Sequence, residues 1–121
     1  MHVELSKRFR FEAAHRLPRV PVEHKCHRLH GHSFEIEVTV AGEIDEAMGW
    51  LMDFGDIRGT VEPVLLNELD HRTLNDVAGL ENATSEMLCV WLWRRLAPRL
   101  PGLAAVTVFE TCTASCTYRG R

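Results

Sequence analysis

Two stretches of the chain alternate between apolar and polar residues, which is the period of a half-buried β-strand. The first runs from about Val3 to His15 with its apolar residues at odd positions, and the second from about His30 to Gly42 with its apolar residues at even positions. His15 continues the apolar face of the first stretch, and His30 and His32 continue that of the second. Each stretch therefore predicts a strand that carries histidine at one end of its buried face.

Two later segments carry apolar residues at the spacing of an amphipathic helix. The first begins at Asp53 or Asp56 and continues to about Leu69. The second has Thr84 as a favourable N-cap and continues to about Ala97, where prolines and a glycine follow. We therefore expect two helices in the middle of the chain, separated by a polar loop.

The last part of the chain predicts two more strands, from about Ala104 to Thr111 and from about Thr113 to Arg119. The order strand–strand–helix–helix–strand–strand predicts an α+β fold, a four-stranded antiparallel sheet with both helices on one face. Four strands do not comfortably close into a barrel, so two sheet edges stay open. Pairing of these edges between subunits, into a ring that forms a β-barrel, is the expected remedy.

Length and composition fit one globular domain, residues 1–121, with 45% apolar and 26% charged residues. The net charge of -3 argues against a nucleic-acid partner, which requires a clustered basic surface. No apolar run reaches membrane-spanning length, and the chain enters a strand pattern directly from Met1, so we expect no signal peptide and a cytoplasmic protein. The four cysteines are expected to stay thiols, with Cys89 in the core and Cys112 buried in a strand.

His15, His30 and His32 are the strongest candidates for a chemical site. If the first two strands are neighbours, the three imidazoles meet at one end of one sheet face. Three histidines without a fourth protein ligand are typical of a catalytic zinc site with an open position. A single core histidine is more often a packing residue, but burying three imidazoles without a partner is costly, which favours the metal site.

Cys26 lies four residues before His30, on a long loop that must pass close to any metal held there. A neighbouring cation or metal lowers the pKa of a thiol, so Cys26 suits a proton-abstracting base or a nucleophile. The alternative is a fourth zinc ligand in a closed structural site.

Asp70 and His71 form a candidate acid–base pair, because adjacent side chains can converge in a loop. The alternative is a histidine that complements the dipole of the preceding helix. Glu110 is predicted to point inward from its strand among apolar neighbours. It suits either an acceptor for a ligand with adjacent N–H donors or a buried ion pair.

Several motifs occur in a fixed order along the chain. They are Phe11-Glu12-Ala13-Ala14-His15-Arg16-Leu17, Cys26-x-x-x-His30-Gly31-His32-Ser33-Phe34, Asp53-Phe54, Leu69-Asp70-His71, Asn82-x-Thr84-Ser85-Glu86 and Glu110-Thr111. Together they resemble the 6-pyruvoyl-tetrahydropterin synthase family over almost the whole chain. The three residues between Cys26 and His30 resemble the bacterial 6-carboxy-tetrahydropterin synthase branch of queuosine biosynthesis, since the pyruvoyl branch typically has a longer gap.

The resemblance implies a lyase of the tunnelling fold that converts 7,8-dihydroneopterin triphosphate to 6-carboxy-5,6,7,8-tetrahydropterin, acetaldehyde and triphosphate. It implies a homo-hexamer, a dimer of trimers, whose pockets lie at subunit boundaries, with a small-molecule pterin as partner and neither nucleic acid nor membrane. The implied roles are zinc binding by His15, His30 and His32, catalysis by Cys26, Asp70 and His71, and pterin binding by Glu110, Thr84 and Ser85.

Three alternatives stay open. A 6-pyruvoyl-tetrahydropterin synthase would eliminate triphosphate from the same substrate. A non-catalytic pterin- or metal-binding module would need none of Cys26, Asp70 and His71. A zinc hydrolase would need a carboxylate base beside the metal, which the sequence does not obviously supply.

Overall fold

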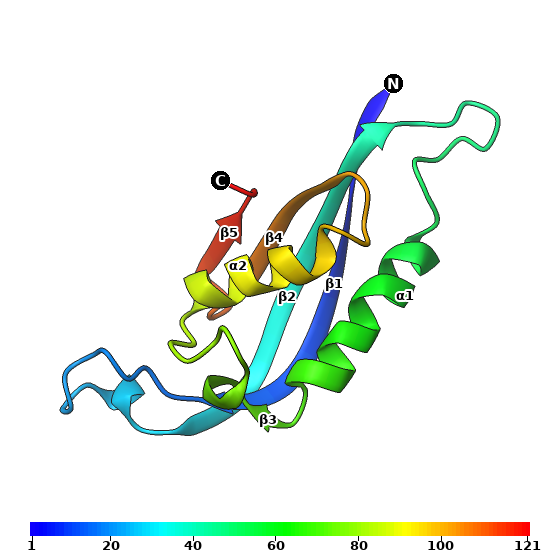
Figure 1. Cartoon of the computed structure of the whole chain (residues 1–121). Coiled ribbons are helices and arrows are strands. Elements are labelled where there is room, and N and C mark those ends of the chain that lie inside the picture. Colours follow the sequence, from blue (N-terminus) through cyan, green and yellow to red (C-terminus); the bar gives the residue numbers. More distant parts are fainter.

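Two long antiparallel strands, β1 (His2–His15) and β2 (His30–Glu43), lie side by side in the sheet (Figure 1). The computed structural model describes all residues, 1–121. Beyond β2 follow β4 (Leu103–Phe109) and β5 (Ser115–Tyr118), both antiparallel to their neighbours. On the other side β3 (Arg72–Thr73) pairs in parallel with β1, giving the strand order β3-β1-β2-β4-β5.

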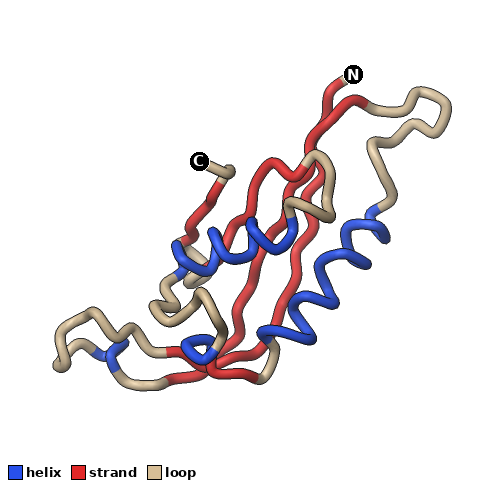
Figure 2. Tube along the Cα trace, viewed as in Figure 1, coloured by secondary structure: helices blue, strands red, loops and turns tan.

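The expected α+β architecture is confirmed, with α1 (Phe54–Val64) and α2 (Ser85–Leu96) lying across one face of the sheet (Figure 2). The expected number of strands and their purely antiparallel pairing are wrong, because the sheet has five strands and β3 is parallel. A strand of two residues is too short to show an alternating pattern, so β3 lay within the predicted polar loop. The same loop contains the short 3₁₀ turn η3 (Leu74–Asp76), whose Leu74 is fully buried.

Both helices begin at the predicted caps. The Asp53 side chain accepts a hydrogen bond from the backbone N–H of Gly55 at 2.8 Å, and that of Thr84 accepts one from the N–H of Met87 at 3.1 Å. After Pro63, α1 widens into the π-helical turn η2 (Leu65–Leu69). A proline has no N–H to donate inside a helix, which explains a change of helix type close to it. The predicted end of the first helix near Leu69 is therefore right, but its last turn is not α-helical.

The core lies between the sheet and the two helices. Central β2 contributes fully buried Ile36, Val38 and Val40, and α2 contributes Leu88 and Leu92. Cys89 of α2 is also fully buried, as expected, and burial raises the pKa of its thiol to about 12.

The second half of the sheet differs from the prediction at its turn. β4 ends at Phe109, and residues 110–114 form an exposed connection to β5. Glu110 is therefore exposed rather than enclosed among apolar side chains, and Cys112 is exposed rather than buried in a strand. The predicted break between the two strands, at Cys112 alone, is too short, because the threonines on either side of it have high strand propensity.

Both edges of the sheet are open. β3 pairs with β1 only at Ala13 and Ala14, so most of the outer edge of β1 is unpaired, and β5 forms the other edge. Exposed strand edges are templates for pairing with another chain. No helix in the structure is long and apolar enough to cross a membrane.

Candidate active site

The antiparallel register places the three histidines together, because His15 pairs directly with His30. The ring centroid of His15 lies 4.7 Å from that of His30 and 5.2 Å from that of His32. One ring nitrogen from each of the three lies within 4.8 Å of the other two. The predicted convergence of the imidazoles is therefore confirmed, and they form a group that can hold a metal ion.

The outer nitrogen of each imidazole is committed to the backbone. The Nδ1 atoms of His15, His30 and His32 each lie 2.8 Å from a carbonyl oxygen, those of Ala83, Arg28 and Ser33 respectively. A carbonyl only accepts, so each Nδ1 carries the proton and each Nε2 keeps a lone pair. Histidines that bind metal through one nitrogen almost always donate the other to such a group. The donor set therefore fits a divalent metal with three nitrogen ligands.

His15 is the most buried member of the group, with 3% of its surface exposed. Burial lowers the pKa of its imidazole, and the neighbouring His30 and His32 lower it further, against the opposing hydrogen bond to Ala83. The neutral form that results is the form that ligates a metal.

Cys26 lies in the 3₁₀ turn η1 (Lys25–His27) of the long loop between β1 and β2. Its backbone is fixed by two hydrogen bonds, one from the N–H of Leu17 to the Cys26 carbonyl at 2.8 Å and one from the Cys26 N–H to Nδ1 of His24 at 3.0 Å. The residue lines a cavity of about 710 Å³ together with His30, His32 and Glu110. Cys26 is not part of the group of converging ligand atoms.

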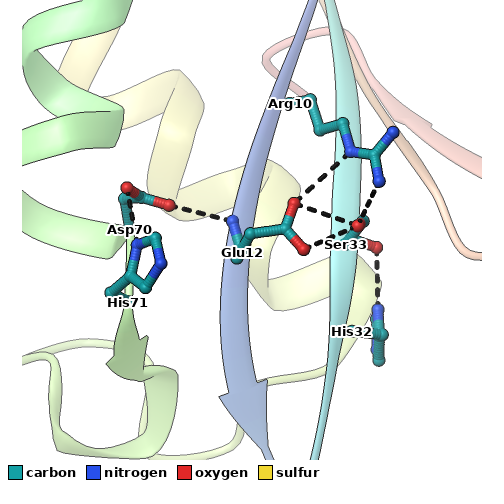
Figure 3. Close-up of polar contacts among 6 residues, drawn as sticks. All are labelled: Arg10, Glu12, His32, Ser33, Asp70 and His71. Carbon is teal, nitrogen blue, oxygen red and sulfur yellow. Dashed lines mark hydrogen bonds and ion pairs between the residues drawn. The ribbon is translucent and has the colours of Figure 1, made fainter.

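Asp70 and His71 do converge, with His71 Nδ1 2.9 Å from Asp70 Oδ2 (Figure 3). The other Asp70 oxygen accepts a hydrogen bond from the backbone N–H of Glu12 at 2.9 Å. This backbone contact, and then the His71 side chain, hold the pKa of the Asp70 carboxyl below its usual range. His71 has a positive φ of 57°, which its own N–H stabilises by donating to the Glu12 carbonyl at 2.6 Å.

Glu110 lies just beyond β4 and accepts a hydrogen bond from the hydroxyl of Ser85 at the start of α2. Together with His15 and Thr84 they line a cavity of about 350 Å³. The three predicted pterin-binding residues, adjacent Thr84 and Ser85 and the more distant Glu110, thus border one cavity next to His15.

Within one chain the candidate residues fall into two groups. Glu110 lines both the cavity of Cys26 and that of Ser85. His71 instead borders a third cavity. Among the candidate site residues, only His32 lines both this third cavity and the cavity that Cys26 lines. The structure therefore unites the histidines, Cys26 and Glu110, but does not place His71 in the cavity of Cys26.

Two residues that border this region were missed as site residues. Glu12 and Ser33 hold Asp70 and His32 through their backbones, as described above. The only signal in the sequence was their position inside the motifs that contain His15 and His32.

The family model described as 6-pyruvoyl tetrahydropterin synthase matches residues 4–121. The chain belongs to this family. This match confirms the resemblance noted in the sequence and the expectation of an enzyme of this family. Relatives that the chain covers over most of their length support the same conclusion.

Three relatives illustrate the range of names within the family. The chain is 44% identical to a 6-carboxy-5,6,7,8-tetrahydropterin synthase of Synechocystis, over 93% of this chain and 89% of the relative. It is 39% identical to a dihydroneopterin monophosphate aldolase of Pyrococcus furiosus, over 84% and 82%. It is 33% identical to the human 6-pyruvoyl tetrahydrobiopterin synthase, over 97% and 91%.

Solved structures support the fold. The 6-pyruvoyl tetrahydropterin synthase of Caenorhabditis elegans superposes with a TM-score of 0.89 at 28% identity, over 100% of this chain and 97% of that one. A protein of Wolinella succinogenes, at 16% identity, shares the fold with a TM-score of 0.83 over 100% and 99%.

Proposed function

We propose that the chain is a zinc-dependent 6-carboxy-tetrahydropterin synthase, which converts 7,8-dihydroneopterin triphosphate to 6-carboxy-5,6,7,8-tetrahydropterin, acetaldehyde and triphosphate in queuosine biosynthesis. The observation that carries the proposal is the clustering of His15, His30 and His32 beside a cavity that Cys26 and Glu110 also line. The 44% identity to a synthase of this name supports the choice within the family.

Zinc would be held by the three Nε2 atoms, whose orientation is set by the Nδ1 contacts to the backbone. When bound, it supplies a Lewis acid that polarises the side-chain oxygens of the substrate. Because only three protein ligands converge and Cys26 lies outside the group, a bound zinc would remain accessible to the substrate.

Cys26 would act as the base that removes a proton from the substrate side chain. Its backbone is fixed at both the N–H and the carbonyl, so the residue is held at the edge of the cavity that contains two of the metal ligands. Asp70 and His71 would supply the complementary proton transfers, with Asp70 orienting the imidazole through Nδ1 and leaving Nε2 to exchange a proton.

Glu110 would bind the amino-pyrimidine edge of the pterin through two parallel hydrogen bonds, which fix the orientation of the ring. Ser85 holds one oxygen of this carboxylate, and Thr84 caps the helix that presents Ser85. The pterin ring would therefore lie between the end of β4 and the start of α2.

His71 would meet Cys26 across a subunit boundary. Its side chain is 77% exposed, and within the chain it borders a different cavity from Cys26. Both sheet edges are open, so strand pairing between copies would close a β-barrel and bring the two together. We propose a homo-hexamer of two stacked trimers, each subunit a single domain of residues 1–121, acting in the cytoplasm.

Product analysis tests the function directly. The purified protein is loaded with zinc and incubated with 7,8-dihydroneopterin triphosphate, and the products are identified by mass spectrometry. Carboxy-tetrahydropterin with an equivalent amount of acetaldehyde is the expected result. Pyruvoyl-tetrahydropterin would instead assign the activity named for the human relative, and binding without turnover would assign a pterin-binding module.

A further inference from the structure

Three side chains form a cluster on the face of the sheet away from the helices (Figure 3). The Ser33 hydroxyl donates to the Glu12 carboxylate, 2.7 Å from Oε1 and 2.9 Å from Oε2. Arg10 donates to the Ser33 oxygen at 2.6 Å and from Nε to Glu12 Oε2 at 3.3 Å. The Ser33 hydroxyl thus accepts a hydrogen bond from Arg10 and donates one to Glu12.

The backbones of two members of this cluster hold the candidate site. The N–H of Glu12 donates to Asp70, and its carbonyl accepts from the N–H of His71. The carbonyl of Ser33 accepts from Nδ1 of His32. Glu12 and Ser33 are also direct partners in the register of β1 and β2. One cross-strand pair therefore connects the Asp70–His71 pair with a metal-site histidine.

We propose that Glu12 and Ser33, braced by Arg10, are positioning residues that fix the Asp70–His71 pair relative to His32 within each subunit. The roles of Asp70, His71 and His32 in turnover rest on the function proposed above. The connection between these residues through Glu12 and Ser33 does not depend on that function. Because β1 is free of a neighbouring strand along most of its outer edge, the side-chain cluster is what ties Glu12 to β2 beyond the backbone ladder.

Stability alone does not account for the cluster. The Arg10 and Glu12 side chains are 65% and 48% exposed, and ion pairs this exposed add little to stability. The Ser33 hydroxyl lies 2.7 and 2.9 Å from the two Glu12 oxygens, whereas Arg10 Nε lies 3.3 Å from one of them. The Ser33 hydrogen bond is also the largest single cause that lowers the pKa of the Glu12 carboxyl. Ser33 is thus the main partner of Glu12, and it is also the residue whose carbonyl orients His32.

The same two strands supply a matched control. Ser6 and Thr39 are register partners at the far end of the sheet, and their hydroxyl oxygens lie 2.8 Å apart. Ser6→Ala therefore removes one cross-strand hydroxyl contact from the same ladder without touching the candidate site. Ser33→Ala removes the corresponding contact beside it, and Ser33→Thr keeps the hydroxyl.

The test combines kinetics with amide hydrogen exchange on the intact protein. Ser33→Ala keeps the backbone carbonyl that contacts His32 but removes the hydroxyl that holds Glu12. It is expected to lower kcat by roughly 10-fold with little change in KM, at the low end of the range for groups that support a metal ligand. It is also expected to speed exchange at the amides of Glu12 and His71 in protein without substrate. Ser33→Thr and Ser6→Ala are expected to match wild type in both measurements.

Two results would overturn the proposal. One is a Ser33→Ala protein that behaves like Ser6→Ala in kcat and in exchange at Glu12 and His71. The other is faster exchange along the whole β1–β2 ladder with unchanged kcat, which assigns a purely structural role. Glu12→Ala, which removes the carboxylate that accepts from Ser33, repeats the test if Ser33→Ala does not fold. A wild-type protein without turnover would refute the proposed function, while the exchange comparison would still decide the connection.

Discussion

Ser85, the first residue of α2, donates a hydrogen bond to the carboxylate of Glu110, just past the end of β4. The contact joins the start of a helix to the end of a strand across 25 positions of sequence. It also orients the one acidic side chain that lines both the cavity next to His15 and the cavity next to Cys26. We therefore expect this carboxylate to anchor a ligand that reaches the proposed metal site.

Glu110→Ala is expected to abolish pterin binding while zinc stays bound. Two hydrogen bonds to a charged group contribute about 1.5–3 kcal/mol each, so the affinity should fall at least about 100-fold. Calorimetric titration with a non-reactive pterin, together with metal analysis, measures both. Glu4→Ala is the control, because it removes an exposed carboxylate near the start of β1, far from the candidate site. Equal pterin affinity in the two variants would refute the anchor role.

His30→Ala and His32→Ala are each expected to lose nearly all bound zinc, because each removes one of three converging nitrogen ligands. Elemental analysis of the purified variants measures the zinc content per chain. His2→Ala changes a histidine at the exposed start of β1 and should keep the metal. Full zinc content in both His30→Ala and His32→Ala would refute the proposed zinc site.

Cys26→Ala distinguishes the two roles considered for the thiol. As the general base, its loss should lower turnover by about 10²–10⁴-fold while zinc content and pterin affinity stay the same. As a structural ligand, its loss would weaken zinc binding and thermal stability together. Cys112→Ala, on the exposed turn after β4, controls for general effects of removing a thiol.

The lowered pKa of His15 predicts acid sensitivity of the metal-free protein. The unfolded chain takes up a proton near the ordinary value of 6.5, whereas the folded chain does so only at lower pH. The unfolded state thus binds more protons below pH 6.5, and the free energy of unfolding should fall as the pH drops from there towards the lowered pKa. Urea denaturation from pH 7 to 5 measures this slope, which should decrease in His15→Gln. Equal slopes in the two proteins would contradict the prediction.

A site shared between subunits predicts complementation. Cys26→Ala and His71→Ala should each be nearly inactive alone, but subunits refolded together should regain activity, because some boundaries then combine an intact Cys26 with an intact His71. Light scattering should show an oligomer for both variants. An active monomer, or mixtures as inactive as their parts, would contradict the shared site.

The central strands and the convergence of the three histidines could be predicted from the sequence because their signal is local. Alternation with a period of two fixes which face of β1 and β2 is buried, and His15, His30 and His32 continue those faces. Both helix caps could also be predicted from the sequence, since Asp53 and Thr84 accept hydrogen bonds from N–H groups only two or three residues away.

The remaining features depend on contacts between distant positions. β3 exists because Arg72 and Thr73 reach the edge of β1, and the Asp70 carboxylate meets an N–H that lies 58 positions earlier. No periodicity encodes such a meeting. The connection that begins at Glu110 is longer than predicted for a different, local reason, because its threonines have high strand propensity. The catalytic and pterin-binding roles themselves stay predictions until the variants are measured.

The backbone of His71 has a consequence for how this protein tolerates change. Its φ of 57° lies in a region that costs most residues about 1–2 kcal/mol and costs glycine almost nothing. His71→Gly would therefore relax the chain at this position while removing the imidazole. Selection for thermal stability alone would discard this histidine, so a stabilised variant obtained without an activity screen should be checked first at position 71.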